Sequence, residues 1–67
     1  MTIKSFMKIM PINSAYGDPI EYMIINNKNR KILTQGSKNE IMATEYISLN
    51  IVDVNLDDNE VDINVED

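Results

Sequence analysis

Carboxylate and amide side chains alternate near the C-terminal end of this 67-residue sequence. Asp53, Asn55 and Asp57 have the spacing of the first three oxygen ligands in an EF-hand calcium loop. The match ends there, because Asp58 stands where the loop requires glycine and Asn64 where it requires a bidentate glutamate. We therefore interpret the segment as an acidic turn and predict no metal site.

Other catalytic chemistry also lacks its usual residues. The sequence contains no histidine and no cysteine, so the commonest general base, the thiol nucleophile and the usual zinc and copper ligands are missing. A glycosidase-type acid needs a carboxyl group in an apolar pocket, whereas the carboxylates here gather on a polar face. A chain of this length also leaves little volume for a substrate cleft. We predict that the protein is not an enzyme and binds no cofactor.

Charge is distributed very unevenly along the chain. Residues 1–52 have a net charge of +2, whereas residues 53–67 contain seven acidic and no basic residues and have a net charge of −7. Alternate residues of a strand share one face and lie about 6.8 Å apart, so the polar side chains of this segment would form a regular row. We call this row the acidic ladder; it comprises Asp53, Asn55, Asp57, Glu60, Asp62, Asn64 and Glu66.

A C-terminal β-hairpin is expected to hold the acidic ladder. Asp58-Asn59 suits a two-residue turn, and apolar residues alternate with polar ones on both sides of it. Pairing outward from the turn matches every apolar residue with another: Leu56 with Val61, Val54 with Ile63, and Val52 with Val65. Ile51 and Val52 are adjacent apolar residues that interrupt the alternation, which predicts a β-bulge.

Three further strands and one short helix are predicted upstream. Alternating apolar residues from Ile3 to Ile9 indicate a first strand, which Pro11 limits to an edge or a strand end. A hairpin between Ile20 and Gln35 is expected to have a three-residue loop, residues 27–29. This loop would pair Ile24 with Ile32, Met23 with Leu33 and Tyr22 with Thr34. Ser37 and Glu40 have the spacing of a capping box, for a helix of at most two turns.

These elements predict one small domain, residues 1–67, that is mainly β. We expect a five-stranded open barrel or roll in the order β-β-β-short α-β-β, which is also the order of elements in an OB-type barrel. A chain of this length can bury only a thin core, and it contains no cysteine to form disulfides. We therefore expect a homodimer or higher homo-oligomer that forms through exposed strand edges. No apolar run approaches the roughly 20 residues that cross a bilayer, so we expect no membrane partner and a cytoplasmic location.

Lys28, Arg30 and Lys31 form a basic loop that is a secondary candidate site. An OB-like order would suggest binding of single-stranded nucleic acid there. The net charge of −5 and the presence of one Phe, three Tyr and no Trp argue against it, because neither a basic footprint nor a stacking platform is present. Nucleic acid is therefore not the partner that we expect.

Two interpretations of the acidic ladder stay open from the sequence. In one, it keeps the protein soluble or offsets Lys4 and Lys8 on a neighbouring strand, where exposed pairs contribute only about 0 to 1 kcal/mol. In the other, it is the binding surface of a non-catalytic module that meets a basic surface of another protein. The second interpretation is our leading hypothesis.

The size, acidity and composition of the chain add a narrower form of this hypothesis. Eleven Ile and nine Asn are typical of an AT-rich genome, and the chain resembles small acidic phage proteins that mimic nucleic acid. Such a protein would inhibit a host defence or DNA-processing protein in the host cytoplasm. The alternative hypothesis is a homo-oligomeric structural or accessory protein of the virion type, and the third is a weak single-stranded nucleic-acid binder that uses the basic loop.

Overall fold

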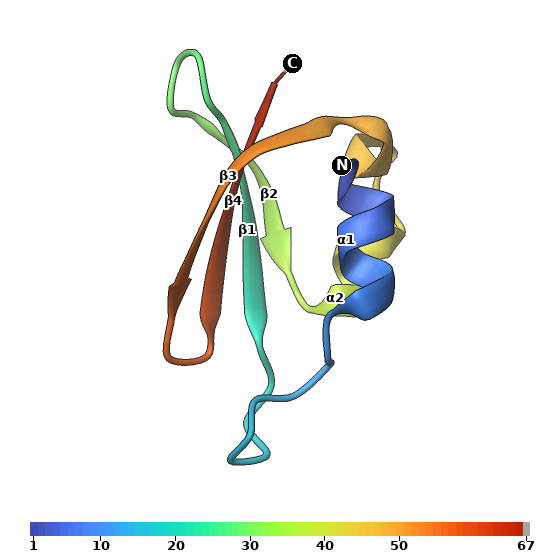
Figure 1. Ribbon diagram of the computed structural model, residues 1–67, viewed down its shortest axis with the longest axis vertical. Helices are drawn as coiled ribbons and strands as arrows, with labels where there is room; N and C mark the ends of the chain where they lie inside the picture. The colour runs from blue at the N-terminus through green and yellow to red at the C-terminus, as the bar shows by residue number, and fades with distance from the viewer. Residues whose placement is uncertain (67) are drawn as a thin grey trace.

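A four-stranded sheet with its helices on one face forms the protein (Figure 1). The computed structural model describes residues 1–66. The elements in chain order are α1 (Ile3–Ile9), β1 (Glu21–Asn26), β2 (Ile32–Gly36), α2 (Lys38–Met42), the 3-10 helix η1 (Glu45–Ser48), β3 (Asn50–Asp57) and β4 (Glu60–Glu66). The strands are in the order β2-β1-β4-β3. None of the helices in this part of the chain is long and apolar enough to cross a membrane.

Two antiparallel hairpins build the sheet. β1 pairs with β2, and β3 pairs with β4, while β1 and β4 lie side by side in the middle and run parallel. Parallel neighbours cannot be joined by a tight turn, so the chain needs a long connection between them. Here that connection includes β2, the helical segment of α2 and η1, and β3.

The prediction of a first strand at Ile3–Ile9 is wrong, because this segment is helix α1. Thr2 caps it, since its hydroxyl oxygen accepts a hydrogen bond from the backbone N–H of Ser5 at 3.2 Å. Ile3 and Met7 are buried and lie one turn apart, whereas Ile9 is 72% exposed. The helical period therefore explains the burial better than alternation does. Residues 1–66 form four strands, and the five-stranded barrel or roll with OB-like order is not confirmed.

The C-terminal hairpin forms with the predicted register around its turn. Val54 pairs with Ile63 and Leu56 with Val61. The predicted pairing of Val52 with Val65 is wrong, because Ile51 takes that place and Val52 falls at the register shift. The predicted bulge is therefore present, and Val52 is its extra residue.

The first hairpin also forms, but its predicted register is wrong. Ile24 pairs with Thr34, two residues beyond the predicted Ile32. The loop closes where the N–H of Asn26 donates to the carbonyl oxygen of Lys31 at 2.8 Å, so residues 27–30 form a four-residue loop where three residues were predicted. A further irregularity in the β1–β2 ladder adds the second residue of the shift.

The capping box that starts α2 is confirmed. The Ser37 hydroxyl accepts from the Glu40 amide at 3.3 Å, and the Glu40 carboxylate accepts from the Ser37 amide at 2.9 Å. These hydrogen bonds to its charged form lower the pKa of the Glu40 carboxyl group.

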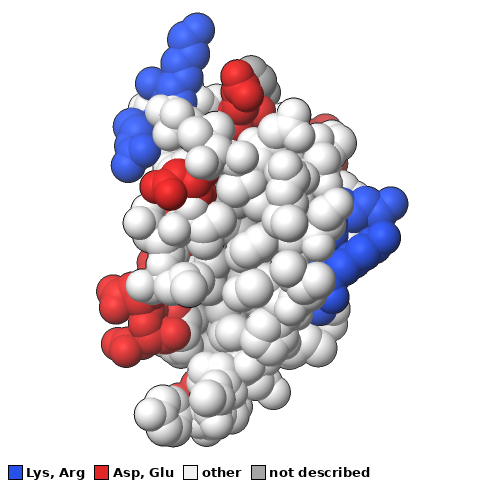
Figure 2. Space-filling model, viewed as in Figure 1, with Lys and Arg blue, Asp and Glu red and all other residues white. Residues whose placement is uncertain are grey.

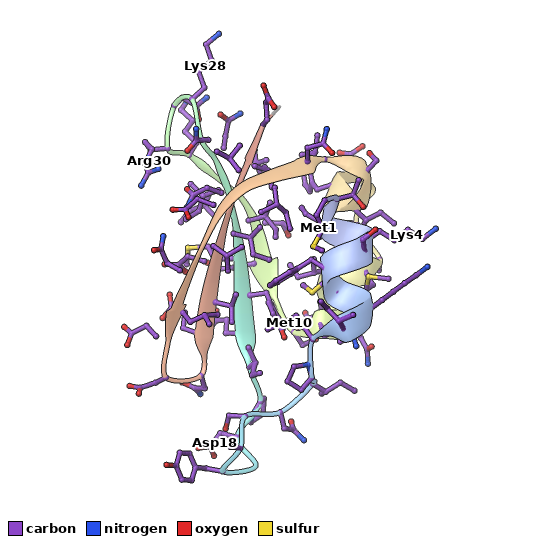
Figure 3. The ribbon with its side chains drawn as sticks, viewed as in Figure 1. Met1, Lys4, Met10, Asp18, Lys28 and Arg30 are labelled. Atoms are coloured by element: carbon purple, nitrogen blue, oxygen red, sulfur yellow. The ribbon has the colours of Figure 1, made fainter. Side chains whose placement is uncertain are left out.

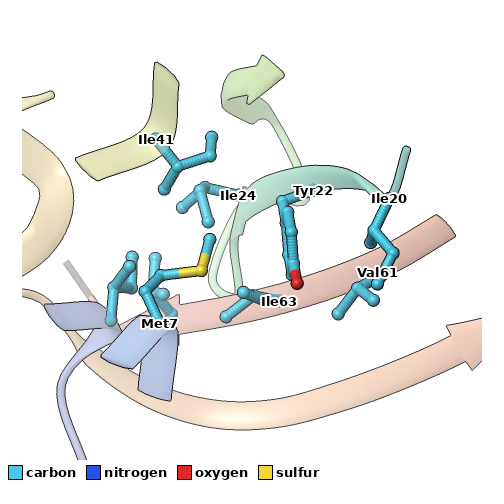
Figure 4. Packing of buried hydrophobic residues seen from close by; sticks show 9 residues of the cluster. Met7, Ile20, Tyr22, Ile24, Ile41, Val61 and Ile63 are labelled. Atoms are coloured by element: carbon cyan, nitrogen blue, oxygen red, sulfur yellow. The ribbon is translucent and has the colours of Figure 1, made fainter. Parts of the chain in front are cut away.

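The core lies between the helices and one face of the two central strands (Figure 4). Tyr22 is fully buried, and its hydroxyl donates a hydrogen bond to the carbonyl oxygen of Pro11 at 2.8 Å. Burial raises the pKa of this hydroxyl. The other buried apolar residues of this cluster are Ile3, Met7, Ile20, Ile24, Ile41, Val61, Ile63 and Val65. The residues of β1 and β4 that alternate with these point to the opposite face, which no described helix covers.

Shortening one core side chain should show where the stability comes from. Ile63→Val removes one methylene from a fully buried site, so we expect a loss of about 0.5–1.5 kcal/mol in the free energy of unfolding, measured in urea. The matched control is Ile9→Val at a site that is 72% exposed, where the change should stay within about 0.5 kcal/mol. Equal losses in both variants would contradict this placement of the core.

Candidate functional site

The acidic ladder lies on the uncovered face of the sheet, on its β3–β4 half. Three cross-strand pairs form its centre, and Glu66 continues it opposite Asn50. These pairs are Asp53 with Asn64, Asn55 with Asp62, and Asp57 with Glu60. In Figure 2, acidic side chains gather on the side of the molecule away from the helices. The structure thus brings all seven predicted residues together on one face.

The ladder is not exposed along its whole length. Asn64 is 2% exposed and Asp62 is half-buried, whereas the other five members are exposed. Burial here follows from the parallel pairing of the central strands, which places Met23 beside Asp62 and Ile25 beside Asn64. The two innermost ladder positions therefore have an apolar strand on one side and exposed acidic residues on the other.

The basic loop is ordered by its own amide side chains. The Asn26 Oδ1 atom accepts from the backbone amides of Lys28 at 2.9 Å and Asn29 at 3.3 Å, and Asn29 Oδ1 accepts from the amide of Lys31 at 3.0 Å. Arg30 adopts a φ of 63°, which reverses the chain toward β2. The three basic side chains are exposed, and the loop lies at one end of the sheet (Figure 3).

Arg30 connects the two predicted sites. Its Nη1 atom donates to the Oδ1 atom of Asn64 at 3.2 Å, so one cation of the loop lies against the buried amide of the ladder. This contact was not predicted, because it depends on the left-handed conformation of Arg30 and on the packing of β1 against β4. Lys28, by contrast, projects away from the sheet in Figure 3.

Carboxylates crowd together at the turn end of the ladder. Glu60 pairs with Asp57 on one side and with Glu21 on the other, and Asp62 is its neighbour on the same face. The charge of Asp62 raises the pKa of the Glu60 carboxyl group, and smaller effects of the same sign come from burial, from a hydrogen bond with Asp62, and from Glu21 and Asp57. The Oδ1 atom of Asp62 is buried and accepts no hydrogen bond. This end of the ladder thus contains unrelieved negative charge.

Lys4 and Lys8 do not offset this charge. Both lie on α1, which packs on the opposite face of the sheet, and Lys4 points away from the sheet in Figure 3. The expectation that these lysines lie on a strand next to the ladder is therefore wrong. That expectation followed from the prediction of a strand at Ile3–Ile9, and this segment is a helix.

Residues 1–66 contain no group of three or more acidic residues arranged to hold a metal ion. The calcium-like spacing of Asp53, Asn55 and Asp57 falls on strand β3, where alternate side chains lie about 6.8 Å apart and point in one direction. Ligands of one calcium ion must converge on a point at 2.3–2.6 Å, which a strand does not allow. This segment therefore presents its oxygens separately to the surface.

Two hollows lie near the β3–β4 turn. The larger has a volume of about 410 Å³, and the smaller, of about 390 Å³, includes Glu21 and Glu60 in its lining. The larger is lined by Ser14, Ala15, Tyr16, Asp18, Asp58 and Asn59. Tyr16 is 94% exposed, so this aromatic ring is held at the surface and does not close the hollow.

Comparison with known proteins assigns no relationship: no family model, curated protein sequence or solved structure matches the chain.

Replacing Glu60 with glutamine should stabilise the protein at pH 7, because it removes the repulsion from Asp62. The pKa of Glu60 is higher in the folded than in the unfolded state, so the folded protein takes up this proton first as the pH falls. Repulsion in the wild type is complete above the raised pKa and is relieved as the pH falls through it toward the usual value of 4.5. Urea unfolding at several pH values should therefore show the advantage of E60Q shrinking as the pH falls.

Glu66→Gln is the matched control, because it removes the same charge from the other end of the ladder, opposite Asn50. An advantage of E60Q that is independent of pH, or that E66Q equals at every pH, would contradict the assignment of the repulsion to Asp62.

Proposed function

We propose that the protein is a non-catalytic binding module that presents the acidic ladder to a basic surface of another protein. One observation carries the proposal: the ladder occupies the uncovered face of a sheet whose other face is packed against the helices. The side chains are thus held on two paired strands, one of them central, so little ordering is needed when a partner binds.

The unrelieved charge at the turn end supports this proposal. Glu60 and Asp62 repel each other in the free protein, and the buried Asp62 Oδ1 atom lacks a donor. A Lys or Arg side chain of a partner would supply both a positive charge and hydrogen-bond donors. The contact of Arg30 with Asn64 is an example of such a cation on the ladder within the same chain.

The basic loop would set the orientation of the partner. One group of basic side chains lies at the loop end of the molecule and a second lies on the helix side, whereas a cluster of acidic side chains lies nearer the β3–β4 turn (Figure 2). The basic surface of a partner would be attracted by the carboxylates at the turn end of the ladder and repelled by Lys28 and Lys31 at the loop end. The most basic part of the partner would therefore lie at the turn end.

The spacing of the charges favours a basic protein surface in general over close mimicry of nucleic acid. The five carboxylates of the ladder span about 20 Å, or one charge per about 4 Å, whereas duplex DNA carries one per about 1.7 Å. An inhibitor of a host defence or DNA-processing protein, of the phage type, is the narrower form of the proposal. It would need the partner to tolerate this lower charge density.

A homo-oligomeric structural or accessory protein is the second candidate function. The observation in its favour is the apolar half of the uncovered face, where Met23 and Ile25 are half-buried and Ile32 is 55% exposed. Sedimentation equilibrium at high micromolar concentration tests this candidate, since a monomer there would exclude it.

Binding of labelled octa-lysine, measured by fluorescence anisotropy, tests the acidic ladder directly. The ladder variant D53N/D57N/D62N should bind the peptide about tenfold more weakly than the wild type, because it removes three charges from one face. Wild-type binding should also weaken above about 0.15 M salt, where the screening length is about 8 Å.

The control variant D18N/E45Q/D58N loses the same three negative charges outside the ladder. Asparagine also accepts the positive φ of 52° at position 58. We expect this control to bind within about threefold of the wild type. Equal losses in both variants would show that net charge alone attracts the peptide, and the proposal would be wrong.

A further inference from the structure

Strand β3 forms one edge of the sheet, and its outer side is only partly occupied. At its start, the backbone of residues 1 and 2 pairs with it: Thr2 forms an antiparallel bridge with Asn50, and the Ile51 N–H donates to the carbonyl oxygen of Met1 at 2.8 Å. No other described strand pairs with the outer side of residues 52–57, a length of about 20 Å. The first residues of this edge thus already pair with the backbone of another segment, whereas the rest of the edge does not.

The geometry of the hairpin determines which backbone groups are free. Asp57 and Glu60 close the two-residue turn, and the ladder of an antiparallel pair alternates from there. The backbone groups of Asp53 and Asn55 are therefore directed toward β4, and those of Val54 and Leu56 are directed outward. An edge with outward N–H and C=O groups is a template for another extended chain.

Side chains on the two faces of β3 differ sharply. On the uncovered face are the ladder residues Asp53, Asn55 and Asp57. On the helix-side face, Val54 is half-buried and Leu56 is 71% exposed, because β3 packs extensively only against β4 among the described elements. A strand added at this edge would meet acidic groups on one face and exposed apolar surface on the other.

A second copy of the chain does not complement this edge. Antiparallel pairing of two β3 strands at this edge would place the aspartates of both copies on the same face, and pairing about Asn55 would set Asp53 directly against Asp57 twice. Directly opposed like charges destabilise a strand pair. The charge of the edge therefore favours a basic partner over self-association.

We infer that the partner adds an extended segment to the free edge of β3, with Lys or Arg at alternate positions facing the acidic ladder and β-branched or apolar residues facing Val54 and Leu56. This inference rests on the proposed function and specifies its mode: main-chain pairing supplies affinity, and the alternation of basic and apolar side chains supplies specificity.

An alternating peptide of four lysines separated by Val and Thr is the probe, and a peptide of the same composition with its lysines clustered at one end is its control. We expect the wild type to bind the alternating peptide at least about threefold more tightly. Amide hydrogen exchange at Val54 and Leu56 should slow when that peptide binds. Equal affinities, or unchanged exchange at both amides, would overturn the inference.

A backbone N-methyl group at Val54, introduced by chemical synthesis of the full chain, blocks the edge without changing any charge. Binding of the alternating peptide should fall about tenfold, while binding of octa-lysine should stay within about twofold. The matched control is an N-methyl group at the exposed Ala15, which should change neither. Should the Val54 variant fail to fold, the exchange measurement on the wild type decides.

These measurements separate the inference from the proposed function. If the Val54 variant binds the alternating peptide as tightly as the wild type, strand addition is wrong and the ladder can still be the binding face. If the ladder variant keeps full octa-lysine binding, the proposed function is wrong. If sedimentation shows a dimer that the N-methyl group abolishes, the occupant of the edge is a second copy, and the inference is overturned.

Discussion

The parallel pairing of β1 with β4 determines where the other elements of this protein can lie. Both strands are central, so β2 and β3 must take the two edges of the sheet. Apolar residues of both strands, among them Ile24 and Ile63, point to one face and hold the helices there. The remaining face keeps the polar side chains, and the acidic ladder is its β3–β4 half. The position of the acidic ladder on the uncovered face is thus a consequence of how the core is packed.

The sequence was sufficient for the hairpin that holds the ladder, because its information is local. A two-residue turn and matched apolar residues on both strands leave one register that buries them, and Val54 with Ile63 follows from it. The slip in alternation marked the bulge, although the paired residue is Ile51 and not Val52. The same alternation also places the ladder residues on one face of the hairpin.

Non-local packing explains what could not be predicted. Ile3, Met7 and Ile9 are compatible with alternation, and only the contacts of α1 with the sheet show that Ile9 is outside the core. No local pattern pairs β1 with a strand about 40 residues away, so the burial of Asp62 and the contact of Arg30 with Asn64 had no signal in the sequence. The register of the first hairpin was wrong for a different reason: the loop is one residue longer than its composition indicated, and an irregularity in the β1–β2 ladder shifts the pairing by one more residue.

The order in which the strands are synthesised also has a consequence. β4 is the last strand of the sheet to be translated, yet it lies between β1 and β3. Before it leaves the ribosome, β3 has no strand to pair with, and β1 has only β2. Completion of the sheet therefore waits for the final strand, and its key contacts join distant parts of the chain, which slows folding relative to a protein with mainly local contacts. During that interval the apolar residues of β1 are open to chaperones or to wrong strand partners.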